Sequence, residues 1–280
     1  MSFASIIRDN TGTGSLIRLI EDGFQRNEVK PPLNPQRDYL RASGIPSMCP
    51  REEVLCAMHG IQRPDTVDAG LNVTFLHGTS LHWGVQNVLL GPLGVLYGSW
   101  RCDGCAFIHG EQNSMRRFEE WAEKRPDICE FDGCKSRSFT YVEASFRDDN
   151  LRLTGHSDGF LVLPGLPGMG ILEVKSVGQK SAREIEQAPQ IGHIVQAHVY
   201  MMFTGFKWGK ILYWKKGDFG MKALVEHHVE RDEEMIENIR ASVQSVWSGI
   251  QSKELPERIC ANDGCPRARA CAAVRQCFPA

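Results

Sequence analysis

The chain has 280 residues, of which 42% are hydrophobic, 9% aromatic and 24% charged, and its formal net charge is −2. This length and composition predict a globular protein with one large domain, or with one domain and a small module. The charge excludes a uniformly basic protein that coats nucleic acid, although a local basic groove is compatible with it. With 27 Gly and 14 Pro, the chain is neither collagen-like nor of low complexity.

The ten cysteines are the unusual feature of the composition. Disulfide frameworks belong to short secreted chains, and the N-terminus shows no secretory signal. No apolar run is long enough to cross a membrane. We therefore expect a protein of the reducing cytoplasm, or of a host cytoplasm if a phage encodes it, with no membrane association. In that compartment, clustered cysteines are more often metal ligands than disulfides.

Residues 1–45 are expected to form an N-terminal extension, with a short helix over 16–24 and a Pro-rich linker over 30–35. Farther along, the sequence Gly-Thr-Ser-Leu-His ends at His82. Thr79 and Ser80 are residue types that cap helices, so we expect His82 near the start of a helix. A lone histidine is usually a bystander, and only its sequence context makes this one a candidate.

Four cysteines in the middle of the chain form two close pairs. Each pair includes an Asp-Gly-Cys sequence, and 23 residues separate the pairs. Two close pairs joined by a spacer are what a tetrahedral Zn²⁺ site needs, and glycines there let backbone N–H groups approach the thiolates. We expect a zinc-finger-like insertion over 100–136, with one spacer helix over 109–127 that carries Met115, Phe118 and Trp121. Four unligated buried thiols are the alternative. The predicted zinc ligands are Cys102, Cys105, Cys129 and Cys134.

The segment from 138 to 250 has the strongest patterning. β-Branched and aromatic residues predict strands, and an apolar periodicity near 3.6 predicts helices. The resulting order, with strands before and between helices, predicts a mixed α/β core. The expected elements are strands over 138–146, 151–163 and 171–177, a helical stretch over 181–204 interrupted at Pro189, strands over 210–215 and 221–229, and a helix over 231–250.

Three charged residues of this core predict metal-assisted chemistry. Glu173 and Lys175 are two residues apart in one strand, so their side chains leave the same face. Asp158 lies in the preceding strand, across a hairpin-like turn, where antiparallel pairing brings it within reach of Glu173. Two carboxylates can hold Mg²⁺ or Mn²⁺, and a nearby ammonium can orient a water. A surface Glu–Lys pair on an edge strand is the common alternative.

The motifs, taken in order, resemble those of RecB-like nucleases in the PD-(D/E)xK superfamily. Their motif series is Gly-Thr-x-x-His, Gly-x-x-Asp, Glu-x-Lys and Gln-x3-Tyr, and it is met here over about residues 40–280. The resemblance implies a restriction-endonuclease-like α/β fold, a mixed sheet flanked by helices, in a nuclease domain over 46–280. The positions that match the motifs are His82, Asp158, Glu173, Lys175, Gln196 and Tyr200.

By this resemblance the histidine and both acidic residues bind Mg²⁺ or Mn²⁺, and the lysine assists the attacking water. The Gln196 and Tyr200 pair lies against the active site and the DNA. Glu143 is a weaker candidate for a further acidic group. The chain departs from the family after the histidine, where acidic residues are frequent and this sequence has Trp83 and Gln86.

The remaining cysteines are similar to those of family members that carry a [4Fe–4S] cluster, such as CRISPR-associated RecB-like exonucleases and AddB-type subunits. The resemblance implies one ligand before the nuclease core and three in a C-terminal cluster over 258–278. A cluster there would join the two ends of the domain and close a long loop. A zinc site formed by Cys277 and the three other C-terminal cysteines is the rival, and Cys56 is expected to be a buried bystander. The cluster ligands implied are Cys49, Cys260, Cys265 and Cys271, with Cys277 as an alternative.

These observations predict a metal-dependent DNA exonuclease that acts on single strands or duplex ends, in recombination, repair or phage DNA processing. DNA is the expected partner, a recombination or repair protein is a possible one, and the oligomeric state stays open. The alternative is a non-catalytic nucleic-acid-binding scaffold with zinc and iron–sulfur sites. A redox iron–sulfur protein is a weaker third hypothesis, because no flavin or dinucleotide motif accompanies the cysteines.

Overall fold

A computed structural model describes residues 16, 20, 38–63, 69–112 and 117–279. The helix expected over 16–24 and the linker over 30–35 lie outside the described residues, except for Leu16 and Ile20, and so do Met115 and Arg116. Within the described ranges, no helix is both long and apolar enough to cross a membrane.

The centre of the fold is a mixed sheet of eight strands in the order β11-β10-β9-β8-β2-β3, with β4 and β5 also paired to β2. Strands β9 and β10 run parallel, and the other pairs are antiparallel. The strands of this sheet are β2 (Leu96–Cys102), β3 (Ile108–His109), β4 (Glu123–Lys124), β5 (Phe139–Val142), β8 (Gly159–Leu161), β9 (Gly170–Val177), β10 (Trp208–Lys215) and β11 (Leu224–Glu230).

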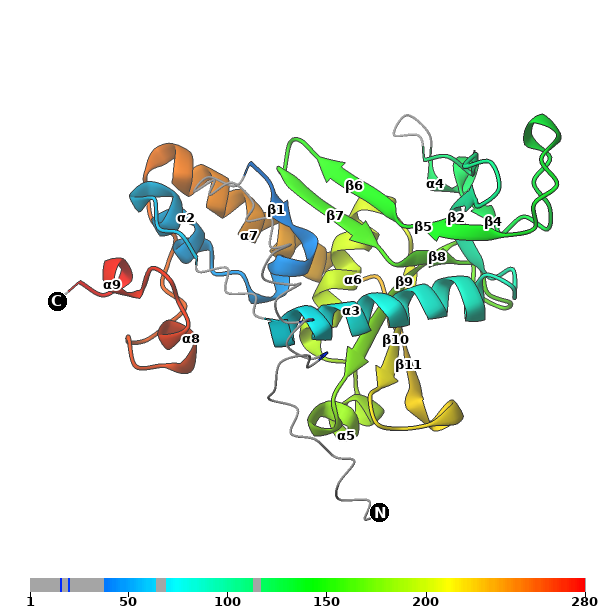
Figure 1. Cartoon of the computed structure of the whole chain (residues 1–280). Coiled ribbons are helices and arrows are strands. Elements are labelled where there is room, and N and C mark those ends of the chain that lie inside the picture. Colours follow the sequence, from blue (N-terminus) through cyan, green and yellow to red (C-terminus); the bar gives the residue numbers. More distant parts are fainter. Residues whose placement is uncertain (1–15, 17–19, 21–37, 64–68, 113–116, 280) are drawn as a thin grey trace, which may run out of the picture.

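A smaller sheet in the order β1-β7-β6 lies beside the larger one (Figure 1). Strand β5 of the larger sheet runs on into β6 of the smaller one, and β7 of the smaller sheet runs on into β8 of the larger one. This change of partner breaks two strands that the sequence predicts as continuous, one at Glu143 and one at Asp158. The strands of the smaller sheet are β1 (Leu40–Arg41), β6 (Ala144–Asp148) and β7 (Leu153–Ser157).

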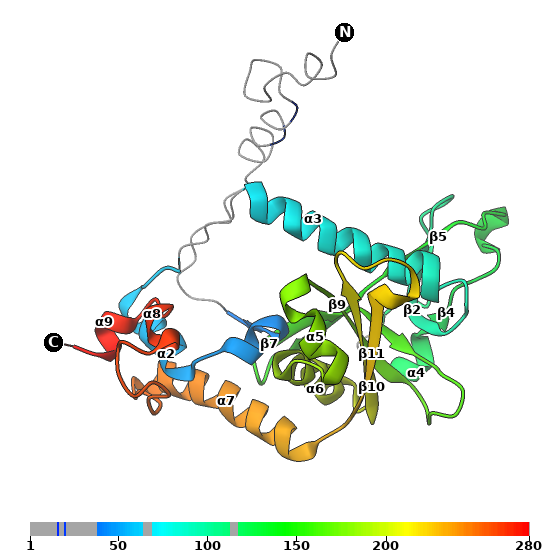
Figure 2. The same cartoon turned by 90° about the horizontal axis from the view of Figure 1, so that it is seen from below.

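Helices cover both sides of the larger sheet (Figure 2). Helix α3 crosses one side, whereas α6 and α7 lie on the other. The expected fold class, α/β with a mixed sheet flanked by helices, is confirmed. The helical segments are η2 (Ala42–Ser47), α2 (Pro50–His59), α3 (Ala69–Trp83), the π-helical η3 (Gly84–Leu90), α4 (Phe118–Trp121), η4 (Phe131–Gly133), α5 (Gln179–Gln187), α6 (Ile191–Thr204), η5 (Gly220–Ala223), α7 (Glu233–Ser252), α8 (Pro266–Arg269) and α9 (Val274–Cys277).

The local sequence explains the elements that surround the site. The first five residues of β9 are all buried, as in a central strand covered on both faces. Helix α7 begins after Asp232, whose side chain accepts a hydrogen bond from the Met235 N–H, and it packs one apolar face inward. Helix α5 ends just before Pro189 and α6 begins at Ile191, as the proline predicts.

Two sequence predictions about local structure are wrong. His82 lies in the last turn of α3 and not in its first turn, and Ser80 donates to the Leu76 carbonyl inside the helix instead of capping it. The described part of the spacer 109–127 holds only the four-residue α4, because the segment after it forms β4 and pairs with β2. Trp121 is buried in the main core. Its packing there, and not helix propensity, therefore sets the conformation of the spacer.

Candidate active site

Three carboxylate residues occupy adjacent positions on three neighbouring chain segments. Ala144 of β6 pairs with Ser157 of β7, so the next pair along this ladder is Glu143 and Asp158. On the other side, Gly159 of β8 pairs with Leu172 of β9, which sets Asp158 opposite Glu173. Antiparallel neighbours at such positions are close enough to interact. The register therefore places Asp158 in the middle of a row with one glutamate on each side.

Asp158 is held from two directions. Its Oδ2 accepts a hydrogen bond from the backbone N–H of Val174 at 2.6 Å. Its Oδ1 lies 3.2 Å from Nδ1 of His82, at the end of α3. Burial lowers the pKa of His82, but the hydrogen bond and charge of Asp158 outweigh it and raise this pKa above its ordinary value. A ring nitrogen and a carboxylate oxygen thus meet at one point, although α3 and β8 are distant in the sequence.

Glu173 is 1% exposed and lies beside the ammonium of Lys175, with 2.5 Å between Oε1 and Nζ. Despite this contact, neither carboxylate oxygen has a hydrogen bond of ordinary geometry within the described part of the chain. Burial and, secondly, the charge of Asp158 raise the pKa of Glu173 to about 8. For Lys175, burial lowers the pKa, but the charge of Glu173 outweighs it and the pKa is raised. A buried carboxylate without hydrogen bonds is costly unless a cation or a proton joins it.

Helix α6 supplies the next two predicted residues. The Lys175 ammonium donates to Oε1 of Gln196 at 3.2 Å, and the Gln196 amide donates to the Tyr200 hydroxyl at 3.3 Å. Both α6 side chains are buried, and their spacing of four residues puts them on one helix face. This chain of hydrogen bonds fixes the position of the ammonium. The structure therefore brings together all six motif residues that the sequence singles out.

The side chain of Gln86, which in the sequence is only a departure from the family pattern, also reaches the site. Its amide donates to Oε1 of Glu143 at 3.0 Å and to the backbone carbonyl of Asp158 at 2.8 Å. Gln86 is buried, in the π-helical turn that continues α3. A glutamine in a helix has no sequence pattern of its own, so only the fold shows this contact.

The donor set suits a hard divalent cation. Ligand atoms from His82, Glu143 and Asp158 all lie within 4.8 Å of one another. Carboxylate oxygens are the ligands that Mg²⁺ and Mn²⁺ prefer, and an imidazole nitrogen is a common ligand of transition metals. Glu173 is not in this group of three, and its role as a ligand stays a prediction. The role of each of the other motif residues in a reaction is also a prediction.

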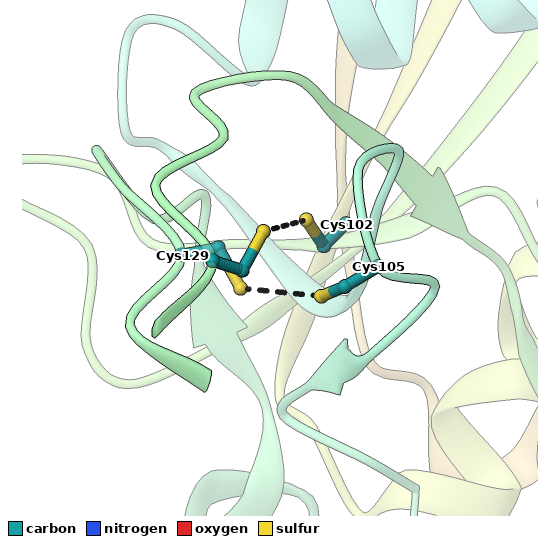
Figure 3. Close-up of side chains that lie close together, drawn as sticks. Cys102, Cys105 and Cys129 are labelled. Carbon is teal, nitrogen blue, oxygen red and sulfur yellow. Dashed lines mark hydrogen bonds between the residues drawn. The ribbon is translucent and has the colours of Figure 1, made fainter. Parts of the chain in front are cut away.

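The four middle cysteines converge at the end of β2. Figure 3 shows Cys102, Cys105 and Cys129 of this group. The sulfur atoms of Cys102 and Cys134 are 3.8 Å apart, and those of Cys105 and Cys129 are 3.7 Å apart. Tetrahedral Zn²⁺ with bonds of about 2.3 Å needs sulfur atoms about 3.8 Å apart. Nε2 of His109 lies 3.3 Å from the Cys129 sulfur. The geometry fits a single tetrahedral metal ion.

Backbone groups favour the thiolate form of Cys102. Burial raises the pKa of Cys102, but N–H groups of Cys105 and Gly104 lower it to about 6. Burial raises the pKa of Cys129 above its ordinary value. A Cβ atom on Gly104 would approach the Cys134 sulfur to 3.3 Å and Cβ of Ser136 to 2.9 Å. The glycine therefore leaves the room that this tight turn needs, as the Asp-Gly-Cys pattern predicts.

The remaining cysteines meet where the two ends of the described chain pack together, around α2, α8 and α9 (Figure 1). The Arg267 guanidinium donates to the Ser47 and Met48 carbonyls, and the Ala272 N–H donates to Glu52. Cys265 caps α8 and lies beside Cys260, whose pKa it raises to about 11. Cys56 is buried, as expected of a bystander. One hollow is lined by Cys49, Cys260, Cys271 and Cys277.

No protein-family model matches the chain, and no curated protein matches it significantly. Among solved structures, it is similar to an alkaline exonuclease, LHK-Exo from Laribacter hongkongensis, at 12% identity and a TM-score of 0.43, over 78% of this chain and 90% of that chain. It is also similar to LHK-Exo in complex with dAMP, at 13% identity, a TM-score of 0.44 and the same coverage. A phage-related exonuclease from Haemophilus somnus 129PT matches at 13% identity and a TM-score of 0.29, over 39% of this chain and 59% of that chain. These similarities are too distant to carry an activity over to this chain.

Proposed function

We propose that this chain is a divalent-cation-dependent deoxyribonuclease that digests DNA from single strands or duplex ends. The observation that carries the proposal is the carboxylate row with a half-buried ammonium beside it: Asp158 lies opposite Glu173, and Lys175 contacts Glu173. A structural ion pair explains Lys175 and Glu173, but it leaves unexplained why His82 and a third carboxylate converge on the same point. Carboxylates that repel one another are stable together when a cation is shared between them.

In this proposal, Asp158, Glu173 and His82 hold Mg²⁺ or Mn²⁺. The ion, when bound, polarises the phosphodiester and lowers the pKa of a water. Lys175 holds this water for in-line attack and offsets the negative charge that develops on the phosphate. Gln196 keeps the ammonium in place by accepting its hydrogen bond, and Tyr200 fixes Gln196. The nuclease domain would comprise residues 46–280, including the insertion.

The two cysteine sites have structural roles in this proposal. Zn²⁺ would occupy the compact group at 100–136, where the sulfur spacing supports it. A [4Fe–4S] cluster would occupy the terminal site, with Cys49, Cys260, Cys265 and Cys271 as ligands and Cys277 as the alternative. In the described part of the chain, these five cysteines do not form a group as compact as the zinc group, and an iron–sulfur cluster is wider than one ion. Free thiols at both sites accord with a reducing cytoplasm.

The insertion would guide the DNA strand. Its tip exposes Phe131, which stacks on Phe107 with ring centroids 4.0 Å apart, and aromatic faces of this kind stack on bases. Lys135 and Arg137 are exposed nearby in the sequence and would contact phosphates. Replacing the exposed Phe131 by alanine should weaken DNA binding, whereas unchanged binding would contradict this role.

The nuclease proposal is tested with DNA labelled at either end, as single strands and as duplexes, incubated with Mg²⁺ or Mn²⁺. The wild-type protein should digest one of these substrates, and Asp158→Asn should not. Asp218→Asn, a carboxylate of the β10–β11 turn that pairs with Lys215, is the matched control and should digest like wild type. If wild type and Asp158→Asn are both inactive but bind DNA, the chain is a non-catalytic scaffold. Equal digestion by all three proteins would contradict the assigned site.

A further inference from the structure

Glu143 is an exposed residue with an unusually fixed side chain. It stands at the break between β5 and β6, where its backbone leaves one sheet for the other. An exposed glutamate ordinarily samples many rotamers, at little cost in free energy. Here its Oε1 accepts a hydrogen bond from a buried amide, that of Gln86. The carboxylate is therefore directed back toward the site.

Gln86 uses both protons of its amide group at this place. One goes to Glu143 at 3.0 Å, and the other goes to the backbone carbonyl of Asp158 at 2.8 Å. The same amide thus ties the side chain of one acidic residue to the main chain of the other. Such a bridge sets the distance between the two carboxylates, as outer hydrogen bonds do for metal ligands.

The position of Glu143 completes a set of donors. A carboxylate oxygen of Glu143, one of Asp158 and a ring nitrogen of His82 lie within 4.8 Å of one another. Glu173 stands on the opposite side of Asp158 in the strand register and is outside this group. The ammonium of Lys175 is engaged on the Glu173 side. Among the described residues, nothing cationic but His82 is recorded in contact with the Asp158 carboxylate, and Glu143 has no recorded ion pair.

We infer that Glu143 is a further protein ligand of the cation that His82 and Asp158 hold, and that Gln86 is the residue that positions it. This inference rests on the proposed nuclease function and identifies the acidic group that the sequence lacks directly after the histidine. In that stretch the chain has Gln86, which recruits a carboxylate from the break between β5 and β6 instead of supplying one. Glu143 would then join His82, Asp158 and Glu173 as a ligand, and waters and substrate oxygens would complete the shell of Mg²⁺ or Mn²⁺.

The test is a titration of the intact protein, with its cysteine-bound metals retained, by Mn²⁺. Binding is measured from the electron paramagnetic resonance signal of the Mn²⁺ that stays free in solution. Glu143→Gln should weaken Mn²⁺ binding by more than about tenfold, and Gln86→Met by about tenfold. The double variant should bind no more weakly than Glu143→Gln, because Gln86 acts only through Glu143. Glu237→Gln, an exposed glutamate of α7, is the control and should bind like wild type. Circular dichroism shows that each variant is folded.

The outcomes separate this inference from the function on which it rests. Asp158→Asn should lose Mn²⁺ binding if the proposed cation site is correct. If Asp158→Asn loses binding but Glu143→Gln binds like wild type, the role of Glu143 is overturned and the proposed function stands. If Asp158→Asn also binds like wild type, the cation site itself is overturned, and the inference with it. A double variant that binds much more weakly than Glu143→Gln would overturn the positioning role of Gln86.

Discussion

Replacing Glu173 by glutamine should change how the stability of the cation-free protein depends on pH. Burial, with the charge of Asp158, raises the pKa of Glu173 from 4.5 to about 8 in the folded protein. The folded state therefore keeps a proton that the unfolded chain has already lost. This contribution to stability is fully present below pH 4.5 and is lost as the pH rises through about 8. A glutamine at this position does not titrate, so the variant lacks this dependence.

The expected magnitude follows from the two pKa values. Each pH unit between them removes about 1.4 kcal/mol from the free energy of unfolding. From about pH 5.5 to about pH 8, wild type should therefore lose about 3 kcal/mol relative to Glu173→Gln. Only the difference in slope matters, because the new amide adds a constant cost from its own unsatisfied hydrogen bonds.

The assay is urea unfolding at several pH values without Mg²⁺ or Mn²⁺, followed by tryptophan fluorescence. Glu230→Gln, an exposed glutamate of β11, is the control and should follow wild type. Adding Mn²⁺ near pH 7 should release a proton from wild type but not from Glu173→Gln, if Glu173 binds the ion. Parallel stability curves for wild type and Glu173→Gln would refute the reasoning, because they would show Glu173 ionised in the folded protein across this range.

Three further predictions concern neighbouring groups. Lys175→Ala should slow DNA cleavage by about a hundredfold to a thousandfold, the range for loss of one electrostatic stabiliser, while Mn²⁺ still binds. The control is Lys210→Ala, which breaks a half-exposed ion pair with Glu226. An unchanged cleavage rate in Lys175→Ala would show that Lys175 takes no part in the reaction. Tyr200→Phe removes the acceptor of the Gln196 amide, so it should cost about 1–3 kcal/mol of stability, measured by urea unfolding. A variant as stable as wild type would mean that this hydrogen bond contributes nothing. Cys129→Ser should lower the zinc content, measured by elemental analysis, toward zero. It should leave any visible absorption of an iron–sulfur cluster unchanged. Retention of one zinc per chain would contradict the four-cysteine site.

The sequence predicts the elements whose patterns are local. Strand β9 and helices α6 and α7 follow directly from apolar periodicity and from the stop at Pro189. The middle cysteine group also follows from the sequence, because each close pair lies on a tight turn that brings its two sulfur atoms together. For the same reason, Glu173 and Lys175, two apart in one strand, and Gln196 and Tyr200, four apart in one helix, are found side by side.

Features that depend on distant contacts are not predictable in this way. The segment around Glu143 has uniform β propensity, and its break arises from the exchange of partners between two sheets. The insertion spacer has a helical pattern, but Trp121 packs into the core and β4 pairs with β2. Thr79 and Ser80 are good capping residues, yet α3 begins ten residues before Thr79, at Ala69, and carries His82 to its end. The contact of Gln86 with Glu143 joins residues 57 positions apart and has no local signal.

In the proposed mechanism, carboxylate-bound cations contact the phosphate that is cleaved. The most direct measurement is the cleavage rate of DNA in which sulfur replaces one non-bridging oxygen of the terminal phosphodiester. Mg²⁺ is a hard ion that binds oxygen and accepts sulfur poorly, whereas Mn²⁺ accepts it better. We expect one of the two sulfur diastereomers to be cleaved slowly with Mg²⁺, and we expect Mn²⁺ to restore its rate. Equal rates for oxygen and sulfur substrates with both ions, or full cleavage by wild type in the presence of a chelator, would contradict this mechanism.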